Sequence, residues 1–268
     1  LRKLKHKAAG AVEKMLAKLE RLDALKKNPQ SLNIINLFKK ISHKKLNQLY
    51  QSMLNEHNIS RDKLNIILQN NSKIVYFPLH LQPELTTSTL GGIFQDQIYA
   101  LETLSALLGE DWTILVKENP KQSYFQRREL FFERLANIPN TYLVDKLFPS
   151  QTLMEHAKLL ATITGTAGWE AIKSNKKCLI FGQAWYTSLE NCFIYDKYFS
   201  ESAFFDFLQQ KTSFSGLKSS FEVLNSKAGH GVIDYAYTPL VEDFDLSTNS
   251  KLVAKSLNML IQHPKTQW

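Results

Sequence analysis

The chain is poor in cysteine and has no long hydrophobic run. Only Cys178 and Cys192 are present among 268 residues, which excludes a disulfide-stapled scaffold and fits a reducing compartment. No stretch approaches the roughly 18 uninterrupted apolar residues that predict a membrane-spanning helix. The leading residues carry no signal-peptide pattern. We therefore expect a cytoplasmic protein and, because the sequence starts at Leu1 instead of Met, a fragment of a longer one.

Several catalytic signatures are also missing. The sequence has neither the lysine-bearing P-loop nor the G-x-G-x-x-G spacing, which disfavours an ATPase and a simple NAD dehydrogenase. No G-x-S-x-G elbow is present, so serine hydrolase chemistry is not expected. The 7 histidines are scattered and show no zinc-ligand spacing with the cysteines. The one D-x-D string, Asp243-Phe244-Asp245, lies in a late acidic loop, so we expect no metal and no cofactor.

Positive charge is concentrated at one end of the chain. Residues 1–72 hold 15 Lys and Arg against 5 Asp and Glu, a net charge of +10, whereas residues 73–268 hold 18 against 20, a net charge of −2. The body of the chain thus lacks the basic patch of a nucleic-acid reader, and no nucleic acid partner is expected.

The basic leading segment, residues 1–27, has apolar residues at steps of three and four and predicts an amphipathic helix. Two interpretations stay open. Either the helix packs on a domain outside this sequence or pairs as a short coiled coil, or it rests on anionic lipid at the inner face of the cytoplasmic membrane.

From residue 73 onward, short β-rich runs alternate with helical stretches. We therefore divide the chain into a basic helical lead-in, residues 1–72, and a Rossmann-like domain with C-terminal helices, residues 73–268. The alternation predicts an α/β fold with a parallel sheet, and strands that are apolar on both faces indicate flanking helices on both sides. The predicted strands are 74–77, 112–116, 142–144, 159–163 and 178–181, and the predicted helices are 96–108, 125–136, 150–157 with Ser150 as its cap, 167–174, 200–230 and 247–262.

Ligands bind at the carboxyl edge of an open parallel sheet, so the residues after each predicted strand are candidates for a site. The loop after the first strand is stiffened by proline and can hold His80 and Glu84 rigidly beside a pocket, which makes both of them catalytic candidates. The alternatives are a loop histidine with its hydrogen bonds satisfied and a surface carboxylate. After the fifth strand, Gly182 permits a close backbone approach, and Tyr186 can wall a sugar or base pocket. The alternative is that these residues pack in the core.

The loop after the second predicted strand is basic. Lys117 ends that strand and Arg127 follows a little later. Such side chains at a strand edge can neutralise a phosphate. The alternative is an ordinary turn flanked by Lys and Glu.

The turn after the fourth predicted strand is the most informative segment. Thr164, Gly165, Thr166 and Gly168 form a bend of small residues in which backbone N–H groups, threonine hydroxyls and a helix N-terminus can hold an anion. Glu170 follows within reach of a ribose hydroxyl pair. The alternative is a tight strand-to-helix turn that binds no ligand.

Five strings follow one another in a fixed order between about residues 73 and 195. Together they resemble the bacterial capsular polysaccharide biosynthesis family, which is similar to the Kdo transferases that use CMP-Kdo. The strings are Tyr76–Glu84 (YFPLHLQPE), Val116–Pro120 (VKENP), Ile138–Asn140 (IPN), Ile163–Ala171 (ITGTAGWEA), and Phe181-Gly182 with Trp185-Tyr186.

The resemblance implies a GT-B-type glycosyltransferase, of which this chain is the C-terminal, nucleotide-sugar-binding half. By position, the string Gln82-Pro83-Glu84 matches the family's glutamine-x-acid motif, so Glu84 is the candidate catalytic carboxylate, acting either as a nucleophile or as a base. The resemblance also implies that Thr164–Thr166 hold the donor phosphate and that Glu170 holds the ribose. Asn119 stands where the Kdo transferases have a histidine that contacts the phosphate. Asparagine carries no positive charge, so a donor other than CMP-Kdo stays open.

The sequence therefore predicts metal-independent transfer of a sugar from a nucleotide donor, CMP-Kdo being one option, to a glycan or lipid-linked acceptor. The basic leading helix would bring the enzyme to the inner membrane surface and to the polysaccharide export machinery. Two alternatives stay open: a non-catalytic protein that binds polysaccharide or steadies an assembly complex, and a sugar-nucleotide epimerase.

Overall fold

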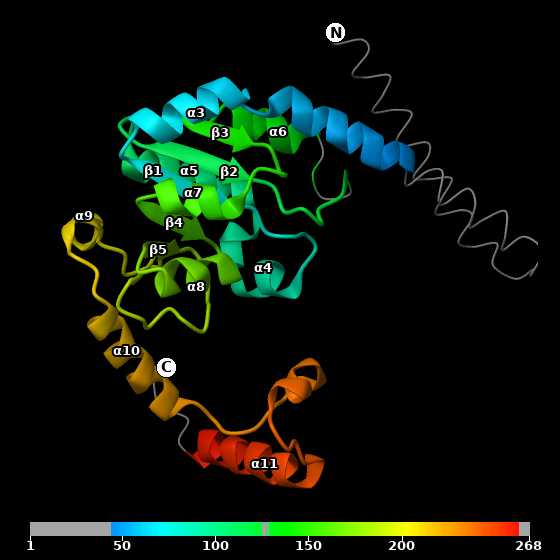
Figure 1. Cartoon of the computed structure of the whole chain (residues 1–268), viewed down its shortest axis with the longest axis vertical. Coiled ribbons are helices and arrows are strands. Elements are labelled where there is room, and N and C mark those ends of the chain that lie inside the picture. Colours follow the sequence, from blue (N-terminus) through cyan, green and yellow to red (C-terminus); the bar gives the residue numbers. More distant parts are fainter. Residues whose placement is uncertain (1–43, 125–126, 128, 263–268) are drawn as a thin grey trace, which may run out of the picture. The chain divides into compact units, whose positions relative to one another are not determined.

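The computed structural model describes residues 44–124, 127 and 129–262 (Figure 1). The predicted basic helix over residues 1–27 lies outside these residues. The described residues form a 6-stranded sheet in which every pair of neighbouring strands is parallel. The strands are β1 (Ile74–Pro78), β2 (Thr113–Lys117), β3 (Thr141–Val144), β4 (Leu159–Thr162), β5 (Lys177–Ile180) and β6 (Cys192–Ile194).

The order of the strands across the sheet is β3-β2-β1-β4-β5-β6. The chain travels outward from β1 to β3 and then crosses back to β4, so β1 and β4 flank the point at which the direction reverses. Tyr76 of β1 lies opposite Leu115 of β2 and Leu160 of β4. This order is that of doubly wound nucleotide-binding folds, which place their ligands beside the reversal point. The predicted Rossmann-like parallel sheet is confirmed.

The strands form because they are short apolar runs that can be covered on both faces. All four residues of β4 and all four of β5 are buried. On one face, Val75 and Phe77 share a hydrophobic core with Ile98 and Leu101 of helix α5 (Gln97–Leu108). Residues of opposite parity, such as Tyr76, point to the other face.

Helices connect the strands, and several begin at a side-chain cap. Ser60 accepts a hydrogen bond from the Lys63 N–H at the start of α3, and Asp96 accepts one from the Ile98 N–H at the start of α5. The helices of this part are a helix over residues 44–57, α3 (Arg61–Asn70), α4 (Leu85–Leu90), η1 (Gly92–Gln95), α5 (Gln97–Leu108), α6 (Glu129–Ala136), α7 (Ser150–His156), α8 (Thr166–Lys173) and α9 (Glu201–Gln209).

Several local features differ from the sequence prediction. The helix predicted over residues 200–230 is interrupted between α9 and α10 (Phe214–Lys227), and α4 was not predicted. The sixth strand, β6, was not predicted; it has only 3 residues, all half-buried, and pairs with β5 at the sheet edge. Ser150 does not cap α7, because Pro149 occupies the N-cap position and Ser150 is the first helical residue.

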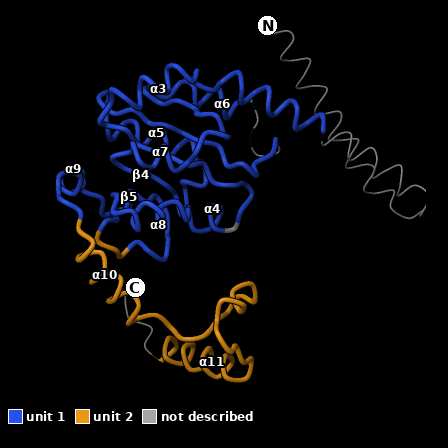
Figure 2. The backbone as a smooth tube through the Cα atoms, in the orientation of Figure 1, with its two compact units in different colours: residues 1–187, 191–212 blue, residues 188–190, 213–268 orange. Residues whose placement is uncertain are grey.

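The helices before the sheet pack on it. Leu46, Tyr50 and Leu54 are buried in the same hydrophobic core as the strands, and the Ile59 N–H donates to the Leu143 carbonyl of β3 over 2.8 Å. Figure 2 accordingly groups the described residues up to Thr187, together with Asn191–Thr212, in one compact unit.

A second compact unit comprises Ser188–Glu190 and the described residues from Ser213 onward. Its elements are α10 (Phe214–Lys227), η3 (Tyr235–Leu240) and α11 (Leu246–Gln262). Leu217 is the buried residue of α10, and α11 has none. The D-x-D string lies here, and Asp245 accepts a hydrogen bond from the Thr248 N–H at the start of α11. Among the described residues, no helix is both long enough and apolar enough to cross a membrane.

Candidate functional site

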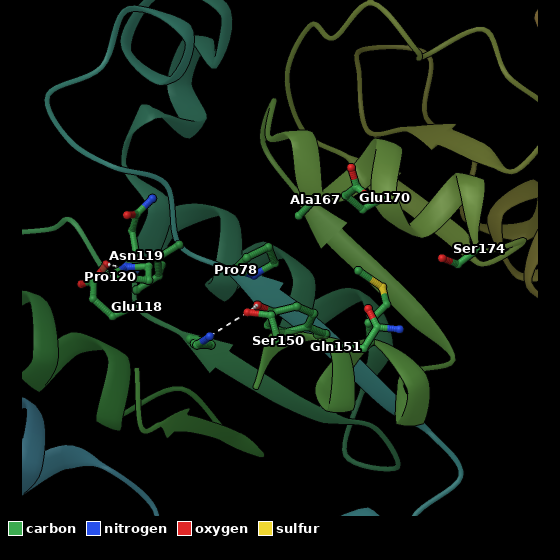
Figure 3. Close-up of a pocket in the computed structure, with 13 residues that line it drawn as sticks. Pro78, Glu118, Asn119, Pro120, Ser150, Gln151, Ala167, Glu170 and Ser174 are labelled. Atoms are coloured by element: carbon green, nitrogen blue, oxygen red, sulfur yellow. Dashed lines mark hydrogen bonds between the residues drawn. The ribbon is translucent and has the colours of Figure 1, made fainter. Parts of the chain in front are cut away.

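A pocket of about 270 Å³ lies at the carboxyl ends of β1 and β2, beside the point between β1 and β4 at which the strand order reverses (Figure 3). Parallel strands alternate their side chains in register, so Tyr76, Pro78 and Lys117 point to the same face of the sheet. Helices α7 and α8 supply the rest of the wall. The lining residues are Tyr76, Pro78, Leu79, Lys117, Glu118, Asn119, Pro120, Ser150, Gln151, Met154, Ala167, Glu170 and Ser174.

The β2 side of the pocket carries a nearly buried cation. Lys117 is 7% exposed, and its Nζ donates a hydrogen bond to Ser150 Oγ over 2.6 Å. The Tyr76 hydroxyl donates to the same oxygen over 3.3 Å. Burial lowers the pKa of Lys117, while the charge of Asp145 acts in the opposite direction. The pocket thus presents a desolvated ammonium group at the end of β2.

The α8 side of the pocket carries a carboxylate. Ala167, Glu170 and Ser174 line it at helical spacings of three and four residues, and Figure 3 shows Ala167 and Glu170 on one helix across from Asn119. Glu170 is exposed and forms an ion pair with Lys173 at 2.9 Å. The predicted residues Lys117, Asn119 and Glu170 are therefore brought together in one pocket.

Two hydrogen bonds within the loop after β2 fix the turn at Asn119. The Asn119 N–H donates to Glu118 Oε1 over 2.7 Å, and its side-chain oxygen accepts from the Lys121 N–H over 3.0 Å. Because that oxygen is occupied, the amide NH2 group is the part of Asn119 that can donate to a ligand.

Arg127, a predicted phosphate ligand, does not line the pocket. Its side chain is fully buried and forms an ion pair with Glu118 at 3.0 Å. Its other nitrogens donate to Gln82 Oε1 and to the His80 carbonyl, while the Tyr50 hydroxyl donates to Glu118 over 2.8 Å. With these donors engaged inside the protein, Arg127 ties the loop after β1 to the loop after β2.

His80, a predicted catalytic residue, is also buried and lies outside the pocket lining. The Ile163 and Thr164 N–H groups point at its Nε2 over 3.3 and 3.5 Å, so Nε2 is an acceptor. The proton then resides on Nδ1, which lies 3.1 Å from Thr87 Oγ1, and Thr162 Oγ1 lies 2.9 Å from Nε2. Burial and the Arg127 charge lower the pKa of His80 to about 4. A neutral histidine thus joins the loops that follow β1 and β4.

The two glycines of the small-residue bend after β4 pack against protein side chains. A Cβ at Gly165 would lie 2.9 Å from Thr162 Oγ1 and 3.1 Å from His80 Cε1. A Cβ at Gly168 would collide with the ring and hydroxyl of Tyr186, which also donates to the Gly165 carbonyl. Of the bend residues, Ala167 alone lines the pocket.

The remaining predicted residues flank the bend and the β1 loop. Thr166 is exposed at the first position of α8, and the Thr164 hydroxyl is buried with no hydrogen-bond partner among the described residues. A Cβ at Gly182 would meet the Leu90 carbonyl oxygen and Thr164 Cγ2. Tyr186 is buried behind the bend and so does not wall the pocket.

The predicted catalytic motif also lies outside the pocket lining. Gln82 donates to the Gln95 carbonyl over 2.7 Å and accepts from Arg127. Glu84 is exposed at the N-cap position of α4, and its side chain makes no capping hydrogen bond.

Sequence reasoning missed five polar lining residues: Tyr76, Glu118, Ser150, Gln151 and Ser174. Tyr76 lies inside a strand and Ser174 at the end of a helix. Neither follows a predicted strand directly, so neither was among the candidates. The described residues contain no group of three or more His, Cys, Asp or Glu side chains that could hold a metal ion.

Comparison with known families decides the assignment. The family model described as capsule polysaccharide biosynthesis protein matches residues 6–189, which include every residue of the pocket lining. The chain belongs to this family. The family resemblance noted from the five strings is therefore confirmed. The comparison with curated protein sequences found no match.

Solved structures similar to this chain include two of KpsC from Thermosulfurimonas dismutans. KpsC, beta Kdo 2,7 transferase, has a TM-score of 0.38 and 12% sequence identity, over 66% of each chain. KpsC, beta Kdo 2,4 transferase, has a TM-score of 0.38 and 12% identity, over 68% of this chain and 62% of that one. A third, TarM, has a TM-score of 0.36 and 13% identity, over 75% of this chain and 42% of that one. This chain thus spans less than two thirds of the length of each of these chains, and its assignment to a family rests on the family match.

Proposed function

We propose that this chain is the nucleotide-sugar-binding half of a GT-B-type glycosyltransferase that builds capsule polysaccharide. The observation that carries the proposal is that Lys117 and Glu170 line one pocket at the reversal point of a doubly wound sheet. The lysine matches the charge of a donor phosphate, and the carboxylate can accept hydrogen bonds from ribose hydroxyls. Family membership supplies the setting of capsule synthesis.

The size of the pocket suits part of such a donor. Its volume of about 270 Å³ is just below the range of roughly 300–1,000 Å³ that small-molecule sites occupy. In the proposed enzyme a second domain faces the carboxyl edge and completes the cleft. Glu84 would act at the anomeric carbon from the β1 loop, as a nucleophile or as a base.

The proposed reaction needs no metal, because Lys117 supplies positive charge where a cation would otherwise neutralise the phosphate. CMP-Kdo is one donor, with Asn119 contributing a neutral donor group. The acceptor is a glycan or a lipid-linked glycan, and the basic leading segment would hold the enzyme at the inner membrane surface.

Calorimetry of the full chain with a panel of nucleotides (CMP, UDP, GDP, ADP and dTDP) tests the proposal. We expect one of them to bind. If it is a ribonucleotide, Glu170→Ala should weaken its binding about tenfold without affecting its 2′,3′-dideoxy analogue; if it is dTDP, which lacks the 2′-hydroxyl, the comparison is made with its 3′-deoxy analogue. Lys173→Ala is the matched control, because it breaks the same ion pair and leaves the Glu170 carboxylate in place. A folded protein that binds no nucleotide at millimolar concentration would overturn the proposal.

A second candidate is a non-catalytic capsule-assembly protein that binds a nucleotide sugar or polysaccharide. It is favoured by one observation, that Glu84 lies outside the pocket lining. Capsule output of cells carrying Glu84→Gln separates the two: loss of capsule supports the transferase, and unchanged output supports the assembly protein.

A further inference from the structure

Three polar side chains meet at the wall of the pocket between β1, β2 and α7. Ser150 Oγ accepts one hydrogen bond from Lys117 Nζ at 2.6 Å and another from the Tyr76 hydroxyl at 3.3 Å; Figure 3 marks a bond to Ser150 with a dashed line. A hydroxyl oxygen has two acceptor sites, and both are occupied. The Ser150 hydrogen is therefore left to donate to something outside this group.

Lys117 likewise has donors to spare. An ammonium group carries three N–H bonds, and the bond to Ser150 uses one. Among the described residues no carboxylate oxygen lies within 4.0 Å of its Nζ, and the neighbouring Glu118 is already paired with Arg127. Together Lys117 and Ser150 offer several donors, positive charge and no free acceptor, which is the chemistry of an oxyanion site.

We infer that Lys117 and Ser150 form an oxyanion seat, and that Tyr76 orients the Ser150 hydroxyl toward the ligand. The inference rests on the proposed function, because it locates the acidic group of the nucleotide sugar. That group is either the phosphate of the nucleotide or the carboxylate of an acidic sugar. The seat is distinct from the bend Thr164–Gly168, which packs against His80 and Tyr186.

Burial destabilises the charged form of Lys117 and strengthens the hydrogen bonds that the oxyanion seat makes to a bound anion. Removing a lysine from water disfavours its charged form, and an incoming oxyanion restores that lost stabilisation. In a partly desolvated pocket a charge-assisted hydrogen bond is stronger than it is in open water. Asp145, Glu170 and Glu118 are acidic groups nearby whose negative charge opposes an anion, although Glu118 is paired with Arg127, so the seat depends on both Lys117 and Ser150.

Calorimetry with pairs of ligands tests the inference on the full chain. The nucleotide that binds best in the panel is compared with its own nucleoside, and free Kdo with a neutral hexose. If the phosphate occupies the seat, Ser150→Ala weakens the nucleotide about 10- to 100-fold and leaves the nucleoside unchanged. If the sugar carboxylate occupies it, the same variant weakens Kdo and spares the nucleotide.

The role of Tyr76 has a separate readout. Tyr76→Phe should weaken the anion about threefold through the loss of one orienting hydrogen bond. In the Ser150→Ala background it should have no further effect, because there is no hydroxyl left to orient. A purely structural role for Tyr76 would give the same loss in both backgrounds.

Two further variants keep the test independent of folding. Ser150→Thr retains the hydroxyl and should restore most of the affinity. Ser105→Ala removes a hydroxyl of α5 that donates to the Pro139 carbonyl, outside this pocket, and the variant should bind as the wild type does. Thermal unfolding of each variant identifies any that fails to fold.

The outcomes distinguish this inference from the proposed function. A nucleotide or sugar acid that binds wild type and Ser150→Ala equally overturns the seat and leaves the proposed function standing. A sugar acid that binds through Ser150 while no nucleotide binds supports the seat and overturns nucleotide binding. If neither ligand binds the folded protein, both are overturned.

Discussion

At the scale of single residues, His80 is a buried histidine that serves as a neutral hydrogen-bond hub. It holds the ends of β1 and β4 together only while Nε2 is unprotonated, because two backbone N–H groups point at that atom. Protonation would place a hydrogen against them. The low pKa of His80, about 4, follows from this enclosure and from the charge of Arg127.

The first prediction concerns acid. The unfolded chain binds a proton at His80 below a pKa of about 6.5, whereas the folded chain does so only near 4. The free energy of unfolding therefore falls as the pH drops from 6.5 to 4, by about 3 kcal/mol from this residue. Urea unfolding across this range should show a shallower pH dependence in His80→Gln. Parallel profiles for the two proteins would contradict the neutral histidine.

The second prediction concerns the buried ion pair of Arg127 and Glu118. Glu118→Gln leaves the guanidinium without its counter-charge in a site with no exposure, and removal of one partner of a buried pair costs about 3–5 kcal/mol. Tyr50→Phe removes only a hydrogen bond to the same carboxylate and should cost about 1 kcal/mol. Urea unfolding measures both. Equal and small losses would show that the pair is not structurally important.

At the scale of elements, α8 owes its position to a glycine that faces an aromatic ring. Gly168 is buried, and Tyr186 fills the space that a side chain would need. The Tyr186 hydroxyl also fixes the carbonyl of Gly165, the N-cap residue. The helix that carries Glu170 is thereby held against β4 and β5.

The third prediction follows from that contact. Gly168→Ala should lower the free energy of unfolding by about 1–3 kcal/mol, the usual cost of overpacking, and should shift α8 away from the pocket. Thermal unfolding measures the first effect and nucleotide affinity the second. Tyr186→Phe, which removes the hydroxyl nearest to the new methyl group, should recover part of the stability of Gly168→Ala. A fully stable Gly168→Ala would mean that α8 is not held by this contact.

The elements also show which parts of the molecule a sequence can predict. The alternation of apolar runs and helical stretches was enough to predict strands β1 to β5, since each of these strands is buried on both faces. It missed β6, whose 3 half-buried residues give no pattern of their own. Ser150 was misjudged because a serine at a helix start favours capping, whereas tertiary contacts with Lys117 and Tyr76 occupy its hydroxyl here.

The same limit of local sequence patterns applies to the candidate site. Inspection of strand ends found Lys117, Asn119 and Glu170, because the fold itself brings those ends together. The anion-binding role of the bend stays a prediction, because a missing side chain can make room for a ligand or for another residue. Gly165 and Gly168 make room for His80 and Tyr186, which lie far from them in the sequence.

At the scale of the whole molecule, the two compact units differ in how much apolar surface they bury. The sheet unit has fully buried strands, whereas α11 of the second unit has no buried residue and α10 has one, Leu217. Segments with few buried contacts open locally at low free energy.

The fourth prediction is therefore a difference in hydrogen exchange. Amides of α10 and α11 should exchange much faster than those of β1 and β4 at neutral pH. Mass spectrometry of peptides from the two units measures this directly. Protection of α11 as strong as that of β4 would show that the second unit is as stable as the sheet.

The strand order has a consequence for how the protein is made. A ribosome releases β1, β2 and β3 first, and they can pair at once, but the other edge of β1 waits for β4 to emerge. Until then the nascent chain exposes an unpaired apolar strand, a hazard for aggregation that favours chaperone protection. A message truncated before the codons for α8 yields a polypeptide that contains Lys117 but lacks the opposite wall of its pocket.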